Sequence, residues 1–380
     1  MAERRVGLRE LARRLSYDPG YLSKVVNGRR AVSGDLARRL DAALGAGGLL
    51  EASQLTPDLN GTFAYDDEER LMLAVRHPKR LDREIITSLA KALDTACEQA
   101  YRVGSVTMLK AATAQLGVVS KLAGEARAPL RGEFLGIAAQ YAHFAGWLNA
   151  TTGRLADTEA CYDRALGWAV ESGDAGMIAT TLNLKAGLAW WAGKVGPTIA
   201  LSQAAQRSTS TSAGVRALAA QLEARGHALM GDGDEANRKL DESGSLMEQH
   251  AAGHPQAENE HDPPWIICFC PGYLALQRGL ACSYLGRDAL AAESLSAGLA
   301  EMPPGVLQSE WIAWYDMRLA VAHARAGDPE QACSFAAQAA LIARQTKSSR
   351  LRAKLNCLLA QLSVQWPALP AVADLGELMS

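Results

Sequence analysis

No apolar run in this 380-residue sequence approaches the roughly 18 residues that a membrane-spanning helix requires. The first ten residues, MAERRVGLRE, are charged and lack the apolar centre of a secretory signal. The seven cysteines are odd in number and scattered, which excludes a clustered disulfide framework. We therefore expect a folded protein of the reducing cytoplasm with no membrane partner.

Motifs that carry catalysis are also missing. The sequence has no nucleophile elbow, P-loop or H-E-x-x-H motif, and GAGG at residues 45–48 lacks the strand and the acidic residue of a dinucleotide fingerprint. We expect neither enzyme activity nor a cofactor. The alternative is a metal-dependent enzyme that uses a His/Cys-rich segment, whose spacing fits no standard zinc site and whose WIICFCPGYL part is typical of an apolar helix entry. That segment contains His250, His254, His261, Cys268 and Cys270.

Charge is distributed unevenly along the chain. The whole protein has 39 Lys and Arg against 41 Asp and Glu, a net charge of -2, yet residues 1–50 hold ten basic and five acidic residues. The first fifty residues thus carry +5 and the rest carries -7. A small basic head on an acidic body indicates that the head meets a polyanion.

The head has the spacing of three short helices. Leu8, Leu11, Ala12 and Leu15 recur at helical intervals and predict a first amphipathic helix. Asp18 is a suitable N-cap for a second helix that begins at Pro19 and ends at Asn27-Gly28. A third helix begins at Ser33 and ends before GAGG, with Leu36, Ala37, Leu40 and Leu44 facing inward.

The segment LRELARRLSYDPGYLSKVVNGRR resembles the helix-turn-helix of the Cro/C1-type (XRE) repressor family. The resemblance implies that Pro19–Asn27 enters the major groove of double-stranded DNA, while the preceding helix crosses the backbone. It implies base contacts for Tyr21 and Lys24, close approach at Gly20, and phosphate contacts for Ser23, Asn27, Arg29 and Arg30. Together with the capping Asp18, these residues form the predicted DNA-binding site. The alternative is that the basic residues are only a solvated helix face.

The head departs from the family at its start. XRE repressors have a further helix before the LRELA helix, and this chain has only about seven residues there. Either the start lies upstream or another part of the protein covers the exposed apolar face. A head of some 48 residues buries little surface, so DNA affinity is expected to depend on docking or on dimerisation.

A Pro-, Asn- and acid-rich stretch, QLTPDLNGTFAYDDEERL, predicts a linker, and the Ala/Leu-rich sequence after it contains degenerate repeats. Five glycines mark the repeats. Each has a small residue seven positions before it and an Ala or Thr five positions after it, which would let paired helices approach closely. The glycines are Gly153, Gly193, Gly231, Gly286 and Gly327.

This pattern resembles the tetratricopeptide (TPR) repeat, although the steps of 38 to 55 residues exceed its usual 34. The expected fold is all-α: an N-terminal helix-turn-helix followed by a TPR-like α-solenoid of antiparallel helix pairs. We divide the chain into a DNA-binding domain (1–48), a linker (49–64) and a helical repeat domain for sensing and dimerisation (65–380). The order resembles that of XRE-family regulators with TPR-like domains found in high-GC Gram-positive bacteria.

In TPR arrays the first helix of each pair lines the concave surface, and the resemblance implies which residues face a ligand there. Aromatic rings interleaved with amide and guanidinium groups would suit a peptide or an amphipathic small molecule. The alternative is that the tryptophans pack between repeats, and at least one of the adjacent Trp190 and Trp191 is expected to be structural. The implied ligand-binding residues are Gln140, His143, Trp147, Asn183, Trp190, Trp191, Gln221, Arg225, Tyr273, Tyr284, Trp314, Met317 and Arg325.

The sequence as a whole favours a DNA-binding transcription regulator that acts as a homodimer and senses a peptide or small-molecule effector through its repeats. The alternative from another class is a TPR scaffold that binds partner proteins and carries a vestigial DNA-binding head. Affinity for promoter DNA that falls steeply with salt would distinguish the regulator from the scaffold.

Overall fold

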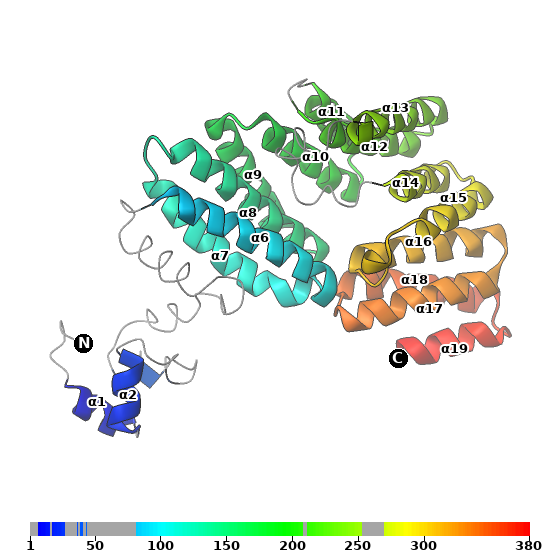
Figure 1. Ribbon diagram of the computed structural model, residues 1–380. Helices are drawn as coiled ribbons and strands as arrows, with labels where there is room; N and C mark the ends of the chain where they lie inside the picture. The colour runs from blue at the N-terminus through cyan, green and yellow to red at the C-terminus, as the bar shows by residue number, and fades with distance from the viewer. Residues whose placement is uncertain are drawn as a thin grey trace.

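The computed structural model of the protein is shown in Figure 1, and it describes residues 7–15, 17–26, 36, 39, 40, 43, 81–207, 211–252 and 270–380. All regular secondary structure within these ranges is helical, which confirms the expected all-α class. None of the helices in these ranges is both long enough and apolar enough to cross a bilayer.

The head contains the first two expected helices at the expected places. They are α1 (Leu8–Leu15) and α2 (Pro19–Val26). Leu11 and Ala12 of α1 and Leu22 of α2 are fully buried. Leu36 and Leu40, from the third expected helix, pack against them in one small core. The expected C-terminal stop at Asn27-Gly28 and the expected cap at Ser33 lie outside the described residues.

The body is a succession of antiparallel helix pairs, coloured from cyan to red in Figure 1. Its early helices are α6 (Arg83–Val103), α7 (Ser105–Glu125), α8 (Arg131–Thr151), α9 (Leu155–Ser172), α10 (Ala175–Trp191) and α11 (Val195–Gln206). The later ones are α12 (Ala213–Leu229), α13 (Gly233–Ala252), α14 (Pro271–Tyr284), α15 (Asp288–Ala300), α16 (Glu310–Ala326), α17 (Pro329–Gln345), α18 (Ser349–Gln365) and α19 (Pro370–Met379), with a short 3-10 turn, η4 (Pro304–Val306).

Each glycine that marks a repeat lies at the turn between the two helices of a pair. The five pairs are α8–α9, α10–α11, α12–α13, α14–α15 and α16–α17. All five glycines have positive φ, between 70° and 87°. A side chain at these angles would be strained, so the glycine permits the chain to reverse within a few residues.

The small residues on either side of these turns are where the two helices of a pair touch. A Cβ added at Gly146 of α8 would lie 2.4 Å from a ring carbon of Tyr162 on α9, and one at Gly279 would lie 2.6 Å from Cγ of Leu295. The corresponding positions after the turns are fully buried. They are Thr158, Thr198, Ala236, Ala291 and Ala332.

The pairs follow a curved path that brings the first described body helices next to the last ones. The turn between α6 and α7 meets the turn between α17 and α18, because a Cβ added at Gly104 would lie 2.7 Å from Cβ of Thr346. The same proximity is visible in Figure 1, where the cyan and orange helices approach each other. The first helices of the pairs therefore enclose space on the concave side.

Candidate functional site

The expected recognition helix α2 begins with a formed N-cap. The carboxylate of Asp18 accepts a hydrogen bond of 2.8 Å from the backbone N–H of Tyr21. A Cβ at Gly20 would lie 3.0 Å from the same carboxylate oxygen, so glycine leaves room for the cap. Lys24 is exposed on the next turn of the helix. Asp18 thus has a structural role at the start of α2, and Lys24 is available to a partner.

The two tyrosines of the head pack against each other. Tyr17 and Tyr21 are stacked with ring centroids 5.6 Å apart. The guanidinium of Arg39 lies over the Tyr17 ring at 5.5 Å, which ties the third helical segment to α2. Tyr21 and Ser23 are half-buried. Three other predicted DNA-binding residues, Asn27, Arg29 and Arg30, lie outside the described residues.

The concave side of the body contains a cavity of about 360 Å³, within the usual range of small-molecule sites. Its walls come from the C-terminal half of α8, from α10 and α12, and from the N-terminal ends of α14, α16 and α18, with a few residues of α6, α7 and α9. Leu184 and Leu188 of α10 and Leu222 of α12 contribute apolar surface. The cavity therefore lies between early and late parts of the chain.

Aromatic side chains from different repeats form much of the wall. The Trp190 ring on α10 meets Trp314 on α16 edge to face, at 5.9 Å between centroids. Trp311 packs in the same way against Tyr273 at 6.1 Å and Tyr315 at 6.2 Å. Edge-to-face pairs of this kind stabilise beyond the area they bury. This aromatic wall holds α10, α14 and α16 together.

Three hydrogen-bonded side chains from α12, α14 and α16 support the aromatic wall. Arg225 on α12 donates from Nε to Oε1 of Gln277 on α14 at 2.8 Å, and its guanidinium lies 4.8 Å from the Trp190 ring centre. Gln277 in turn donates to the hydroxyl of Tyr315 at 2.9 Å. Arg225 is thus committed to holding three helices in place.

On the cavity-lining parts of α10 and α16, four polar atoms are buried without a hydrogen-bond partner among the described residues. Two belong to α10 and two to the first turn of α16. They are Oγ1 of Thr180, Oδ1 of Asn183, Oε2 of Glu310 and Nε1 of Trp311. Buried polar atoms in proteins are nearly always paired with protein groups or water, so these atoms can accept or donate hydrogen bonds toward the cavity.

The charged end of the cavity lies where α16 and α18 begin. Glu310 is the first residue of α16 and Arg350 the second residue of α18. The Arg350 guanidinium lies over the Trp191 ring, 4.0 Å from its centre. Burial lowers the pKa of Arg350, and the negative charge of Glu310 partly opposes that shift. One carboxylate and one guanidinium therefore share this end of the cavity.

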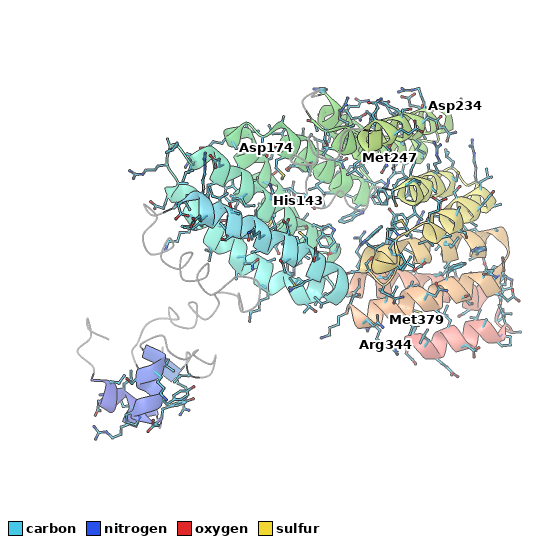
Figure 2. All side chains as sticks on the ribbon, in the orientation of Figure 1. His143, Asp174, Asp234, Met247, Arg344 and Met379 are labelled. Atoms are coloured by element: carbon cyan, nitrogen blue, oxygen red, sulfur yellow. The ribbon has the colours of Figure 1, made fainter. Side chains whose placement is uncertain are left out.

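Two further groups on the wall are kept neutral by burial. Desolvation lowers the pKa of His143, labelled in Figure 2, to about 3, so the imidazole is uncharged near neutral pH. Burial and nearby acidic groups raise the pKa of Cys97 to about 12, so its sulfur stays a thiol. Both side chains are neutral parts of the wall.

The structure brings most of the predicted ligand-binding residues together around this one cavity. Both members of the adjacent tryptophan pair line it: Trp190 is buried among other aromatic rings, as expected of a structural residue, whereas Trp191 is more exposed beneath Arg350. The predicted residues that line the cavity are His143, Trp147, Asn183, Trp190, Trp191, Gln221, Arg225, Tyr273 and Trp314.

Four predicted ligand-binding residues lie outside this cavity. Gln140 borders a separate hollow with Glu133 and Asp174. Tyr284 packs edge to face against the Trp190 ring. Met317 is buried in the core that α16 forms with α17 and α18.

Arg325, the fourth of these residues, lies 3.8 Å from the carboxylate of Asp288. Their position outside the cavity has a geometric cause. Counting a fixed number of residues back from the turn glycine selects the same level on the first helix of every pair. Because the array curves, the cavity instead meets α8 near its C-terminal end and α16 near its N-terminal end.

The charged end of the cavity was not predicted. Glu310, Trp311 and Arg350 all line it. Arg350 belongs to α18, after the last recognised repeat, so no repeat offset points to it. Glu310 and Trp311 lie at the start of α16, a full helix away from the turn at Gly327. The adjacent Glu-Trp pair in SEWIAWY is the only sequence signal, and it is a weak one.

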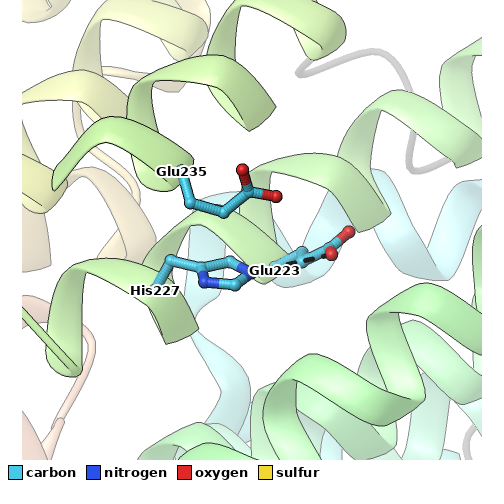
Figure 3. A group of neighbouring side chains, drawn as sticks. All are labelled: Glu223, His227 and Glu235. Carbon is cyan, nitrogen blue, oxygen red and sulfur yellow. Dashed lines mark ion pairs between the residues drawn. The ribbon is translucent and has the colours of Figure 1, made fainter. Parts of the chain in front are cut away.

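A second cluster of titratable side chains lies between α12 and α13, where Figure 3 shows Glu223, His227 and Glu235 as neighbours. Their ligand atoms lie within 4.8 Å of one another. Burial raises the pKa of Glu223, but hydrogen bonds from Gln203, Gln206 and Lys239 outweigh it and hold that pKa below its usual range.

These partners make the cluster a poor metal site. Nζ of Lys239 lies 3.0 Å from the Glu223 carboxylate, and Arg238 is paired with Glu235. Two cations already neutralise the two carboxylates that a divalent ion would need. The residues present therefore fit a structural ion-pair network better than a metal centre.

In the His/Cys-rich segment, which the sequence offers only as an alternative metal site, His254, His261 and Cys268 lie outside the described residues. Cys270, at the start of α14, packs its sulfur 3.6 Å from that of Met302. Its sulfur thus contacts a methionine of the apolar core, as expected of a helix entry.

Comparison with known proteins identifies a domain at the start of the chain. Residues 1–53 match a family model described as a helix-turn-helix domain. No curated protein sequence matches the chain. Among solved structures, the chain is similar to BtubC (BKLC) from P. vanneervenii, with 15% identity, a TM-score of 0.39, and coverage of 64% of this chain and 92% of that one. The protein thus carries an N-terminal helix-turn-helix domain followed by a helical solenoid.

Proposed function

We propose that this protein is an XRE-type transcription regulator whose TPR-like array senses a small molecule in the concave cavity. The observation that carries the proposal is that a helix-turn-helix domain and an aromatic cavity with unpaired polar atoms belong to the same chain. The head supplies an exposed Lys24 on a capped helix for DNA, and the cavity supplies a site for an effector. No catalytic step is part of this proposal.

The position of the cavity supplies a mechanism for coupling. Its walls come from helices far apart in the chain, so a molecule that contacts both α10 and α16 stabilises one curvature of the array. A ligand shifts a population only by its difference in affinity for the two states. In a homodimer, a change in curvature alters the distance between two heads, which must match successive major grooves about 34–36 Å apart.

Genomic DNA recovered with the full-length protein, with and without added cell extract, tests this function. A regulator is expected to recover a small set of shared sequences, to lose affinity steeply with salt, and to change its recovery when extract is present. Recovery no better than that of a protein lacking residues 1–48 would contradict DNA regulation and favour the scaffold that binds protein partners.

A further inference from the structure

Apart from Arg225, which is bonded to Gln277, the charged residues that line the cavity lie at one end, and this polarity carries information about the ligand. This inference rests on the proposal that the cavity binds a small molecule. At the charged end, the buried Glu310 oxygen lacks a donor and the Trp311 N–H lacks an acceptor among the described residues. The same end contains the guanidinium of Arg350, whose stacking on Trp191 leaves its N–H groups at the edge of the fork available as donors.

A ligand head with a single charge fits this end poorly. A cationic amine would pair with Glu310 but would lie near the guanidinium of Arg350. A carboxylate alone would pair with Arg350 and Trp311 but would lie near the Glu310 carboxylate. A head that carries both an ammonium and a carboxylate satisfies every group at once, because each charge finds its opposite.

The helix starts reinforce this arrangement. The N-terminal ends of α16 and α18 line the charged end, and Ser348 caps α18 by accepting a hydrogen bond from the backbone of Leu351. The positive end of a helix dipole favours a carboxylate placed there. The acidic part of the head therefore belongs beside Arg350 and the start of α18.

The rest of the cavity defines the body of the ligand. Residues of α10 line it from Trp191 back to Thr180, a rise of about 16 Å at 1.5 Å per residue. The surface between them is apolar, with Leu184 and Leu188 in the middle. At the far end, the unpaired oxygens of Thr180 and Asn183 provide neutral hydrogen-bonding groups.

We propose that the cavity binds an elongated α-amino acid: a zwitterionic head held by Glu310, Arg350 and Trp311, and a long apolar or aromatic side chain that lies along α10. The ammonium donates to Oε2 of Glu310, and the carboxylate accepts from the Arg350 guanidinium and from Nε1–H of Trp311. No covalent step is involved.

Calorimetric titration of the full chain without DNA, using two matched series of probes, tests the head. The first is L-tryptophan, tryptamine and indole-3-propionate, and the second is 2-aminodecanoate, nonylamine and decanoate. We expect the zwitterion to bind at least tenfold more tightly than both singly charged analogues in one series or both. The proposal is overturned if, in both series, the amine or the acid analogue binds as tightly as the zwitterion, or if neither zwitterion binds.

Substitutions separate the two charges. Glu310→Gln is expected to weaken binding of the zwitterion at least tenfold and to leave binding of the acid analogue unchanged or tighter. Arg350→Gln is expected to weaken binding of the zwitterion and of the acid analogue, but not binding of the amine. Glu293→Gln, on the exposed face of α15 away from the cavity, is the matched control and should bind like the wild type. Circular dichroism and thermal midpoints of each variant verify folding.

These titrations use no DNA, so the two proposals can fail separately. Zwitterion binding without any effect on DNA recovery supports the ligand class and contradicts its regulatory role. DNA recovery that responds to extract, combined with no zwitterion binding, supports regulation and contradicts the ligand class. If Glu310→Gln weakens the binding of all probes to the same extent, that result also contradicts the assigned contacts.

Discussion

The indole rings of Trp190 on α10 and Trp314 on α16 meet edge to face at an angle of 75°. The two residues belong to the second and fifth of the five repeats, so this contact crosses the concave side of the array. Arg318 lies over Trp314 at 5.7 Å and over Tyr284 at 5.1 Å, which extends the cluster along α16. The curvature of the solenoid is thus maintained by direct contact between its early and late parts.

Trp190→Ala is expected to lower the free energy of unfolding by about 3–5 kcal/mol, because it removes a large buried ring and leaves a void. It should also open the array, since the contact with Trp314 is lost. Urea unfolding and the radius of gyration in solution scattering measure the two effects. Trp190→Phe keeps part of the ring contact, so its free energy of unfolding and radius of gyration should lie between those of the wild type and of Trp190→Ala. An unchanged radius of gyration in Trp190→Ala would show that the contact does not hold the curvature.

Gly146→Ala is expected to destabilise the protein by about 1–3 kcal/mol, because the added methyl would lie 2.4 Å from the Tyr162 ring. Gly167→Ala is a matched control inside the neighbouring helix α9, where an added Cβ meets nothing within 4 Å. That change should stabilise by about 0.5–1 kcal/mol through helix propensity. Chemical unfolding of both variants measures the difference, and equal effects of the same sign would refute the close approach of α8 and α9.

Asp316, a buried residue of α16, is expected to make the stability fall as the pH rises. Burial raises its pKa from 3.8 to about 7. Between these values the folded protein binds more protons than the unfolded chain, so stability decreases from about pH 4 to pH 7 and levels off above. Asp316→Asn should remove this slope and exceed the wild type at pH 8 by up to about 4 kcal/mol.

Comparison of the wild type with Asp316→Asn at each pH isolates this group. His143 contributes with the opposite sign, because burial lowers its pKa to about 3 and its contribution to stability is lost as the pH falls from about 6.5 toward 3. Both proteins contain His143, so its effect cancels in the difference. A difference that does not vary between pH 4 and pH 7 would contradict the raised pKa of Asp316.

Lys24→Ala is expected to reduce discrimination between operator and scrambled DNA, because the proposed function assigns this exposed side chain of α2 to base edges. Arg29→Ala is expected to weaken binding to both DNAs about equally, as the loss of a phosphate contact does. Fluorescence-anisotropy titrations at several salt concentrations measure both variants. Equal losses on both DNAs for Lys24→Ala would remove its base-reading role.

Features that depend on a few neighbouring residues were predictable. The cap at Asp18, the start of α2 at Pro19 and the five turn glycines were all found where the sequence placed them. Each depends on backbone angles or hydrogen bonds within one turn of helix. The small residues at fixed distances from the turns were confirmed as buried contacts for the same reason, since a helix pair is a local unit.

The cavity residues were only partly predictable. The repeat offset placed Asn183 and Trp314 correctly on the cavity wall, but it also selected Met317, which is in the core. Glu310 and Arg350, which supply the charges, have no repeat position that distinguishes them. Each helix pair is rotated relative to the one before it, and the sum of these rotations decides which residues of each helix meet the cavity. No short stretch of sequence specifies that sum.

The amino-acid sequence alone therefore determined the all-helical class, the helix-turn-helix head and the pairing of helices, because spacing, caps and glycine angles act over a few residues. Only the tertiary structure decided that the array closes, that Trp190 meets Trp314, and that one carboxylate and one guanidinium share the end of a cavity. The first two of these relationships join helices more than a hundred residues apart, and all three arise from the summed geometry of the whole solenoid.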